Sequence, residues 1–226
     1  MYASMGVVPP ASAHKRTGRP RAQDAPVTLE QILDAAFRAF ATHGYDGVAV
    51  RTLNRELGVS HNLIHQRFGS KQGLWYAAVD RAFGQQVTQL ATGFDPTLSD
   101  PLDQLNHAIR RFVHYSAERP ELLGLMNIEG RLDSERLDYI YENYVAPALA
   151  PLGRLLAHLR ERVRIRPMSL RALFFLIAHG AAAPFTLAPL ARHFDDAEPL
   201  DPHQVAEQAA LTADVITSGL RLNSRS

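Results

Sequence analysis

Four polar side chains lie close together in the segment TLNRELGVSHNLIHQRFGSK, residues 52–71: His61, Asn62, His65 and Gln66. Asn and Gln amides can form paired hydrogen bonds with adenine, and His can bond guanine or a phosphate. His61 and His65 also have the four-residue spacing of metal ligands on a helix, but no third ligand accompanies them in the sequence. These residue types therefore favour contact with DNA over metal binding.

Such side chains need a helix that turns them outward. Gly58 separates two short amphipathic patterns, and glycine best accepts the left-handed conformation that ends a helix. Ser60 then offers a hydroxyl to cap a second helix, in which Leu63 and Ile64 would face inward. A helix, a glycine turn and a second helix form a helix-turn-helix, whose second helix can enter a DNA major groove.

A phosphate site is predicted beside this motif. Ser70 can cap a further helix, and Lys71 lies in its first turn, where backbone N–H groups and the helix dipole attract anions. Thr52 is expected to open the helix before Gly58, where it could cap that helix or contact a phosphate. Thr28 is expected to begin the first helix, with Gln31 completing a capping box.

Short motifs between residues 28 and 75 follow a characteristic order. They are Ala36-Phe37-Arg38-Ala39-Phe40, His43-Gly44-Tyr45, Arg51-Thr52-Leu53, Leu57-Gly58-Val59-Ser60 and Phe68-Gly69-Ser70-Lys71, followed by Leu74. In these motifs the segment resembles the DNA-binding domain of TetR-type (TetR/AcrR) transcriptional regulators. The resemblance implies a three-helix DNA-binding domain joined by a fourth helix to a C-terminal helical domain, which binds a small effector and forms a homodimer.

The DNA-binding residues follow from the motif, from the resemblance and from a basic N-terminal segment. Residues 1–26 are rich in Pro, Ala, Ser and Gly, so we expect a disordered arm that is either a solvated tail or enters a minor groove. We expect the DNA-binding domain at 27–75 and the effector-binding and dimerisation domain at 76–222. The predicted DNA contacts are Thr28, Arg51, Thr52, Ser60, His61, Asn62, His65, Gln66 and Lys71, with Arg19 and Arg21 from the arm.

The composition is that of a chain with a substantial core: 226 residues, 46% hydrophobic and no cysteine. Disulfides and cysteine-ligated metals are therefore excluded. Residues 1–80 carry nine Lys and Arg against six Asp and Glu, so the positive excess falls on the half expected to bind DNA. No apolar run is long enough to span a membrane and no signal peptide is evident, so we expect a cytoplasmic protein without membrane contact.

The C-terminal half has helical patterns throughout. Because no alternating strand pattern appears, the chain is predicted to be all-α. Pro147 and Pro151 are expected to kink or split the third of its helices. The helices are expected at about 101–119, 121–130, 134–164, 169–183 and 201–220.

In the family that the chain resembles, the last two helices usually pair with their symmetry mates in a four-helix bundle. The candidate residues for the effector pocket lie on the helices between residues 101 and 183. The candidate pocket residues are Phe112, Tyr115, Met126, Tyr141, Tyr144, Phe174 and His179. The candidate dimer-interface residues are Phe175, Ala182, Val205, Leu211 and Val215. Plain core is the default interpretation of each aromatic taken singly, and a solvated face or an internal salt bridge is the default for polar anchors such as Glu129. The aromatic character favours an apolar or amphipathic effector.

The resemblance therefore implies a transcriptional regulator, a repressor that binds a pseudo-palindromic operator as a homodimer and is released by a small effector. An activator or dual regulator stays open, as does a helical interaction protein without specific DNA binding. We expect no enzyme and no cofactor or metal, because the sequence lacks a Gly-rich phosphate loop, a nucleophile elbow, a His-Glu-x-x-His motif and a cysteine nucleophile.

Overall fold

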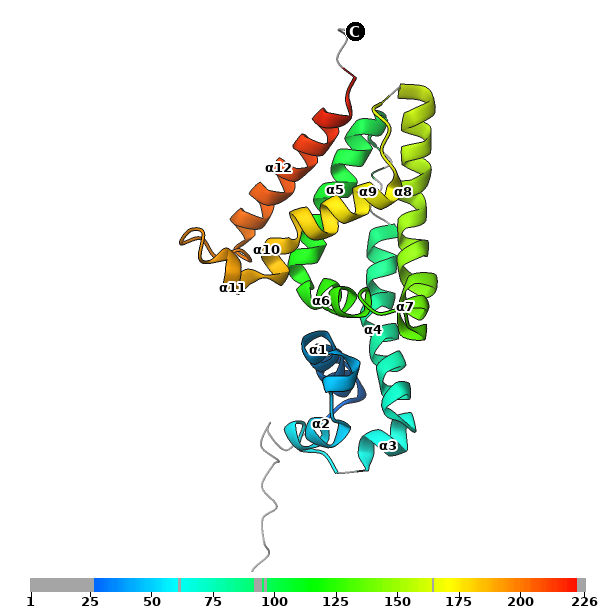
Figure 1. Ribbon diagram of the computed structural model, residues 1–226, viewed down its shortest axis with the longest axis vertical. Helices are drawn as coiled ribbons and strands as arrows, with labels where there is room; N and C mark the ends of the chain where they lie inside the picture. Colours follow the sequence, from blue (N-terminus) through cyan, green and yellow to red (C-terminus); the bar gives the residue numbers. More distant parts are fainter. Residues whose placement is uncertain (1–26, 61, 92–94, 96, 164, 223–226) are drawn as a thin grey trace, which may run out of the picture.

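A computed structural model describes residues 27–60, 62–91, 95, 97–163 and 165–222, so the predicted N-terminal arm and His61 lie outside the described residues. All regular structure within these ranges is helical, which confirms the all-α prediction. Figure 1 shows a small helical unit at one end of an elongated molecule, with α4 running from it into a larger helical unit.

The small unit contains α1 (Leu29–Gly47), α2 (Val50–Glu56) and α3 (Leu63–Phe68), followed by α4 (Lys71–Ala91). The predicted capping box begins α1: the Thr28 hydroxyl accepts from the Gln31 N–H at 3.2 Å, and the Gln31 side chain accepts from the Thr28 N–H at 2.9 Å. Gly44 has a φ of 71°, which interrupts α1 near its end. These local signals set the bounds of the helices that carry the predicted DNA contacts.

The larger unit contains the remaining helices, several of which begin at a residue whose side chain caps the helix. Asp100, Ser134 and Asp201 each accept a hydrogen bond from a backbone N–H in the first turn of the helix that follows. The helices are α5 (Pro101–Glu118), α6 (Pro120–Glu129), α7 (Glu135–Ile140), α8 (Ala146–His158), α9 (Leu170–Phe175), α10 (Ala183–Thr186), α11 (Ala188–Ala191) and α12 (Pro202–Leu220).

The predicted kink at Pro147 and Pro151 takes a different form. Residues 135–163 form a continuous helical run in which α7 and α8 are joined by a wider π-helical turn, η2 (Tyr141–Val145), directly before Pro147. Proline has no N–H to donate and its ring crowds the carbonyl four residues earlier, so a wider turn relieves the conflict without breaking the helix. Similar π-helical segments follow as η3 (Leu159–Val163) and η4 (Leu176–Ala181).

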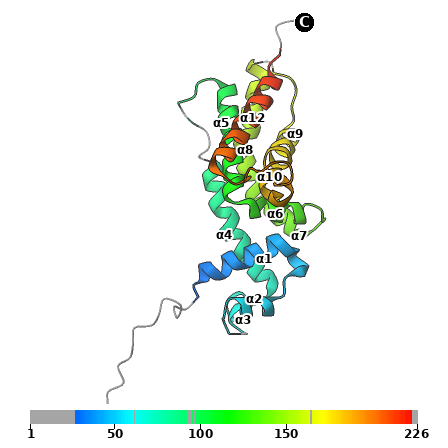
Figure 2. The same ribbon diagram turned by 90° about the vertical axis from the view of Figure 1, so that its left-hand side faces the viewer.

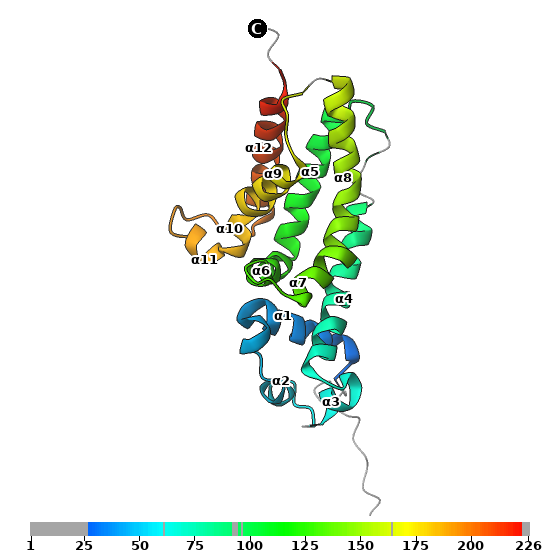
Figure 3. The same cartoon turned by 45° about the vertical axis from the view of Figure 1, so that its right-hand side comes forward.

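Two apolar cores hold the chain together. The upper core joins α5, α8, α9, α12 and η4. Helix α12 lies along α5, and there the Asp214 carboxylate accepts hydrogen bonds from Asn106 at 2.9 Å and from Arg110 at 3.0 Å. The lower core surrounds Phe40 and Trp75 but also includes residues of α5, α6 and α7, among them Leu125 and Ile140. Figures 2 and 3 show α1 lying against the end of the larger unit formed by α6 and α7. The packing of α1 therefore depends on residues of the larger unit, chiefly those of α6.

Candidate nucleic-acid interface and effector cavity

The turn before α3 has the predicted glycine conformation. Gly58 has a φ of 65°, in the left-handed region that favours glycine, and it ends α2. The predicted helix starts need correction by two to three residues: α2 begins at Val50 before Thr52, and α3 begins at Leu63 with Asn62 as its N-cap rather than Ser60. A backbone turn, in which the Leu63 N–H donates to the Ser60 carbonyl at 3.0 Å, precedes α3 and delays its start.

The outer side of α3 carries polar side chains. Asn62, His65 and Gln66 are exposed, whereas Ile64 is buried in the lower core, as the predicted helix orientation requires. Arg67 is also exposed on this helix and was not among the predicted contacts. Its charge and its position directly after Gln66 are the sequence signal that indicates it. The exposed side of α3 is therefore polar and carries one positive charge, that of Arg67.

The start of α4 forms the second part of this surface. The Ser70 hydroxyl accepts from the Gly73 N–H at 3.0 Å, which confirms the predicted cap. The Lys71 ammonium lies 3.5 Å from the Asp46 carbonyl oxygen and 4.6 Å from the centre of the Tyr45 ring. Lys71 is therefore held at the helix N-terminus, where its charge and the helix dipole act together on an anion.

Tyr45 is packed rather than free. Its ring stacks with Phe40 at a centroid distance of 6.0 Å, and the Arg136 guanidinium lies 4.2 Å from the ring centre. Arg136 in turn donates to both carboxylate oxygens of Glu129, at 3.2 and 3.1 Å. Glu129, considered in the sequence as a polar anchor of the pocket, is instead fully buried in an internal salt bridge.

The remaining predicted DNA contacts lie before α1, on α2 and in the turn before α3, or fall outside the described residues. Thr28 is exposed and its hydroxyl is engaged in the α1 capping box. Arg51 is exposed on α2, Thr52 is half-buried, and Ser60 is exposed in the turn. Arg19, Arg21 and His61 lie outside the described residues. The structure thus brings α2, α3 and the start of α4 to the same end of the molecule (Figure 1).

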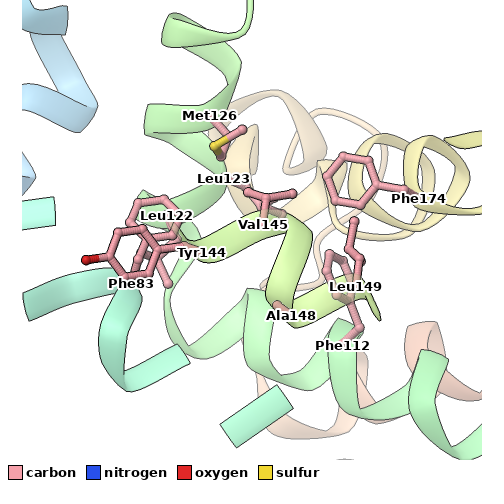
Figure 4. A pocket seen from close by; sticks show the side chains of 10 residues that line it. All are labelled: Phe83, Phe112, Leu122, Leu123, Met126, Tyr144, Val145, Ala148, Leu149 and Phe174. Atoms are coloured by element: carbon pink, nitrogen blue, oxygen red, sulfur yellow. The ribbon is translucent and has the colours of Figure 1, made fainter. Parts of the chain in front are cut away.

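An apolar cavity of about 40 Å³ lies between α4, α5, α6, η2, α8 and α9, well away from α3. Figure 4 shows the side chains around it, which are almost entirely hydrocarbon. A volume of this size holds only one or a few water-sized molecules, so a larger ligand requires its walls to move. The lining residues are Phe83, Phe112, Leu122, Leu123, Met126, Tyr144, Val145, Ala148, Leu149 and Phe174.

Four of the seven candidate pocket residues line this cavity: Phe112, Met126, Tyr144 and Phe174. The other three lie elsewhere. Tyr115 is buried in the lower core, Tyr141 is 55% exposed, and His179 is exposed and stacks with Phe175. The aliphatic lining residues were not singled out in the sequence, because nothing distinguishes a Leu that faces a cavity from one packed in a core.

Tyr144 connects the cavity to α4. Its ring lies in the cavity wall, and its hydroxyl donates to the Asp80 carboxylate of α4 at 2.6 Å. Tyr139 donates to the same carboxylate oxygen at 2.6 Å. Burial, followed by the hydrogen bond to Asp80 and the charge of that carboxylate, raises the pKa of Tyr144 well above the ordinary range of a phenol. Both tyrosines therefore remain neutral donors at physiological pH.

The candidate dimer residues divide into two groups. Phe175, Leu211 and Val215 are between 53% and 62% exposed, although they are large and apolar. Ala182 and Val205 are buried in the upper core of their own chain. Other exposed apolar side chains in this half of the chain are Leu176 in η4, Leu187 between α10 and α11, Leu190 in α11 and Phe194 after α11.

Two kinds of site are absent from the described part of the chain. No helix there is both long and apolar enough to cross a membrane. No group of three or more His, Cys, Asp or Glu side chains comes together there in a way that could hold a metal ion.

Known protein families match both helical units of this chain. Residues 32–78 match the family described as "Bacterial regulatory proteins, tetR family". Residues 101–216, more than half of the chain, match "Tetracyclin repressor-like, C-terminal domain". The chain belongs to the TetR family. The first match covers α3 and the start of α4, and the second covers every cavity-lining helix except α4.

Individual TetR-family relatives agree with this assignment. The chain is 46% identical over 55 residues to the HTH-type transcriptional repressor AcnR of Corynebacterium efficiens, covering 24% of this chain and 29% of that protein. It is 29% identical over 111 residues to the HTH-type transcriptional repressor SCO4008 of Streptomyces coelicolor, covering 48% of this chain and 53% of that protein. The matches thus span about half or less of the relatives' lengths.

Solved TetR-type structures share the fold over nearly their full lengths. The regulator PfmR of Thermus thermophilus superposes with a TM-score of 0.61 at 21% identity, covering 88% of this chain and all of PfmR. FadR of Bacillus subtilis, solved in complex with stearoyl-CoA, superposes with a TM-score of 0.61 at 17% identity, covering 86% of this chain and all of FadR. At these identities the likeness establishes the fold.

Proposed function

We propose that this protein is a ligand-responsive transcriptional repressor that binds a pseudo-palindromic operator as a homodimer. The observation that carries the proposal is the surface made by the exposed polar side of α3 and by Lys71 at the start of α4. In this proposal Asn62, His65 and Gln66 read base edges, while Lys71 and Thr52 contact phosphates and set the register.

The homodimer is supported by the exposed apolar residues Phe175, Leu211 and Val215. Large apolar side chains exposed together on neighbouring helices commonly mark an interface. A dimer presents two α3 helices to major grooves on one side of the duplex, about 34–36 Å or a longer helical repeat apart. The operator is then expected to have two-fold symmetry.

The effector in this proposal is an apolar or amphipathic molecule that enters the cavity beside Tyr144. The lining supports an apolar portion, and the small volume means that binding must separate the walls. Those walls include α4, which leads directly to Lys71, and α6, which lies against α1. An effector releases DNA only if it binds the separated state more tightly than the DNA-binding state, and this coupling is reciprocal.

The test is selection of a random duplex library by the purified full-length protein, followed by measurement of operator affinity at several salt concentrations. We expect a pseudo-palindromic sequence bound about a thousandfold more tightly than random DNA. Lys71→Ala should weaken binding to all sequences and lower the slope of log affinity against log salt by about 0.9. Arg154→Ala, which removes an exposed positive charge on α8, is the matched control.

A second variant separates base reading from phosphate contact. Asn62→Ala should relax the preference at one position of each half-site while leaving the salt slope unchanged. An unchanged preference would contradict the assignment of Asn62 as a base-reading residue. If the wild-type protein selects no sequence, the helix-turn-helix serves another purpose, and an interaction protein becomes the better description. An activator or dual regulator would show the same DNA binding, and only the direction of the transcriptional response separates it from a repressor.

A further inference from the structure

A buried ion pair lies between the two units of the molecule. Glu129, at the end of α6, is fully buried, and Arg136, in α7, donates to both of its carboxylate oxygens. A buried carboxylate is costly without a partner, so Glu129 holds the Arg136 guanidinium firmly in one place. Both hydrogen bonds come from the single Nε–H of Arg136, which is shared between the two carboxylate oxygens.

The other side of Arg136 reaches the DNA-binding unit. Its guanidinium lies 4.2 Å from the centre of the Tyr45 ring, and the Lys71 ammonium lies 4.6 Å from the same centre. Cations at these distances are attracted to the ring electrons. One aromatic ring therefore contacts both a cation that belongs to the larger unit and the cation that we assign to a DNA phosphate.

Helix α6, which carries Glu129, also borders the cavity. Leu122, Leu123 and Met126 of α6 line it, and Glu129 lies three residues after Met126, almost one turn further along. A displacement of α6 that admits a ligand therefore moves the carboxylate that anchors Arg136. At the opposite end of the connection, Lys71 is half-buried against Tyr45 and the Asp46 carbonyl.

We propose that Arg136, held by Glu129, is a positioning residue for Lys71 and links the cavity to the phosphate contact. Arg136 fixes the Tyr45 ring, and that ring restrains the Lys71 side chain near the position where it meets DNA. A lysine loses much side-chain freedom when it is immobilised, so restraint before binding favours the complex. When α6 moves, Arg136 leaves the ring and Lys71 loses this restraint. The inference rests on the proposed function and adds a regulatory connection to it.

The test is a double-mutant cycle on the selected operator. One arm is Glu129→Gln combined with Arg136→Met, which removes both charges without leaving a buried unpaired carboxylate. The second arm is Lys71→Ala, and the third combines all three changes. If Arg136 acts through Lys71, the pair variant weakens operator binding by about three- to fivefold and lowers the salt slope. The triple variant then binds no more weakly than Lys71→Ala alone.

Additive effects of the two arms would overturn the proposal, because they would show that Arg136 acts independently of Lys71. Tyr45→Phe, which keeps the ring, should bind like wild type, and Tyr45→Leu should resemble the pair variant. The matched control is Arg192→Met with Glu198→Gln, an exposed ion pair of 2.8 Å remote from α3, which should leave both affinity and salt slope unchanged. Thermal unfolding of every variant establishes that the chain remains folded.

The outcomes also separate this inference from the proposed function. A wild-type protein that selects no DNA sequence would overturn the proposed function and this inference with it. A wild-type protein that selects an operator, but whose cycle is additive, would overturn the positioning role of Arg136 alone.

Discussion

The Tyr144 hydroxyl donates a hydrogen bond of 2.6 Å to Asp80, while the ring of the same tyrosine forms part of the cavity wall. Asp80 belongs to α4, whose first residue is Lys71. Tyr144 belongs to η2. A ligand that pushes its ring aside must therefore stretch or break a hydrogen bond to α4, the helix that begins at the proposed DNA surface. The two helical units are thus joined at α4 as well as through Arg136.

The bond between Tyr144 and Asp80 should contribute measurably to stability. Tyr144→Phe keeps the ring in the cavity wall but removes the donor, and we expect the free energy of unfolding to fall by about 1 kcal/mol. Urea denaturation followed by circular dichroism measures this change. Tyr141→Phe, at an exposed tyrosine in the same π-helical turn, is the matched control and should have little effect. Equal stability of the two variants would show that the bond contributes nothing.

Alkaline pH should destabilise the protein through the same tyrosines. Burial and Asp80 raise the pKa values of Tyr144 and Tyr139 above the ordinary value of 10.0. Above about pH 10 the unfolded chain loses these protons while the folded protein keeps them, so the free energy of unfolding falls as pH rises. Below about pH 9 the stabilisation from these two tyrosines is fully present, and they should add no pH dependence to the free energy of unfolding. The measurement is urea denaturation at a series of pH values.

The double variant Tyr139→Phe with Tyr144→Phe should show a shallower fall in alkaline solution, since it lacks both ionisable groups. Tyr141→Phe serves as the control and should keep the wild-type profile. An identical alkaline slope in the double variant would assign the effect to other groups, Tyr115 first, because burial also raises its pKa.

Filling the cavity should block effector binding without affecting DNA binding. Ala148 lines the cavity beside Leu149, and Ala148→Leu adds a branched side chain to a space of about 40 Å³. We expect this variant to bind the selected operator normally but to lose binding of apolar probes such as decanol and decanoate. Ala157→Leu, on the exposed side of α8, is the matched control.

Trp75 offers the readout for probe binding. It is the single tryptophan of the chain, it is fully buried, and its ring lies 6.3 Å from that of Tyr139. Movement between α4 and α7 should therefore change its emission. A probe-induced change that persists in Ala148→Leu would place the binding site elsewhere.

The exposed apolar side of α12 should determine the oligomeric state. Leu211→Glu places a charge where we propose a partner subunit, and burying an unpaired charge is strongly unfavourable. We expect the variant to sediment as a monomer and to bind a full operator much more weakly than wild type. Ala157→Glu on α8 is the control for adding one negative charge and should remain a dimer. A Leu211→Glu protein that remains dimeric would exclude α12 as the interface at this position.

The sequence determined the features that depend on neighbouring residues. The capping box at Thr28, the caps at Ser70, Asp100 and Asp201, and the left-handed turn at Gly58 were all predictable. Each arises from a side chain bonded to a backbone group two or three residues away, or from the conformational freedom of a single glycine. The family motifs lie in the same local stretch, and for this reason the family was recognisable from residues 28–75.

Only the tertiary structure decided which side chains meet across the molecule. Tyr45 and Arg136 are 91 positions apart, and no local pattern indicates that they touch. Tyr144 faces the cavity while Tyr141 faces solvent, because the wider turn of η2 places residues three apart on different sides, unlike an α-helix. The sequence by itself determined the fold class, the family and the polar side of α3. The packing of α4, α6 and η2 against one another determined where the cavity lies and how it is joined to the surface that we propose for DNA.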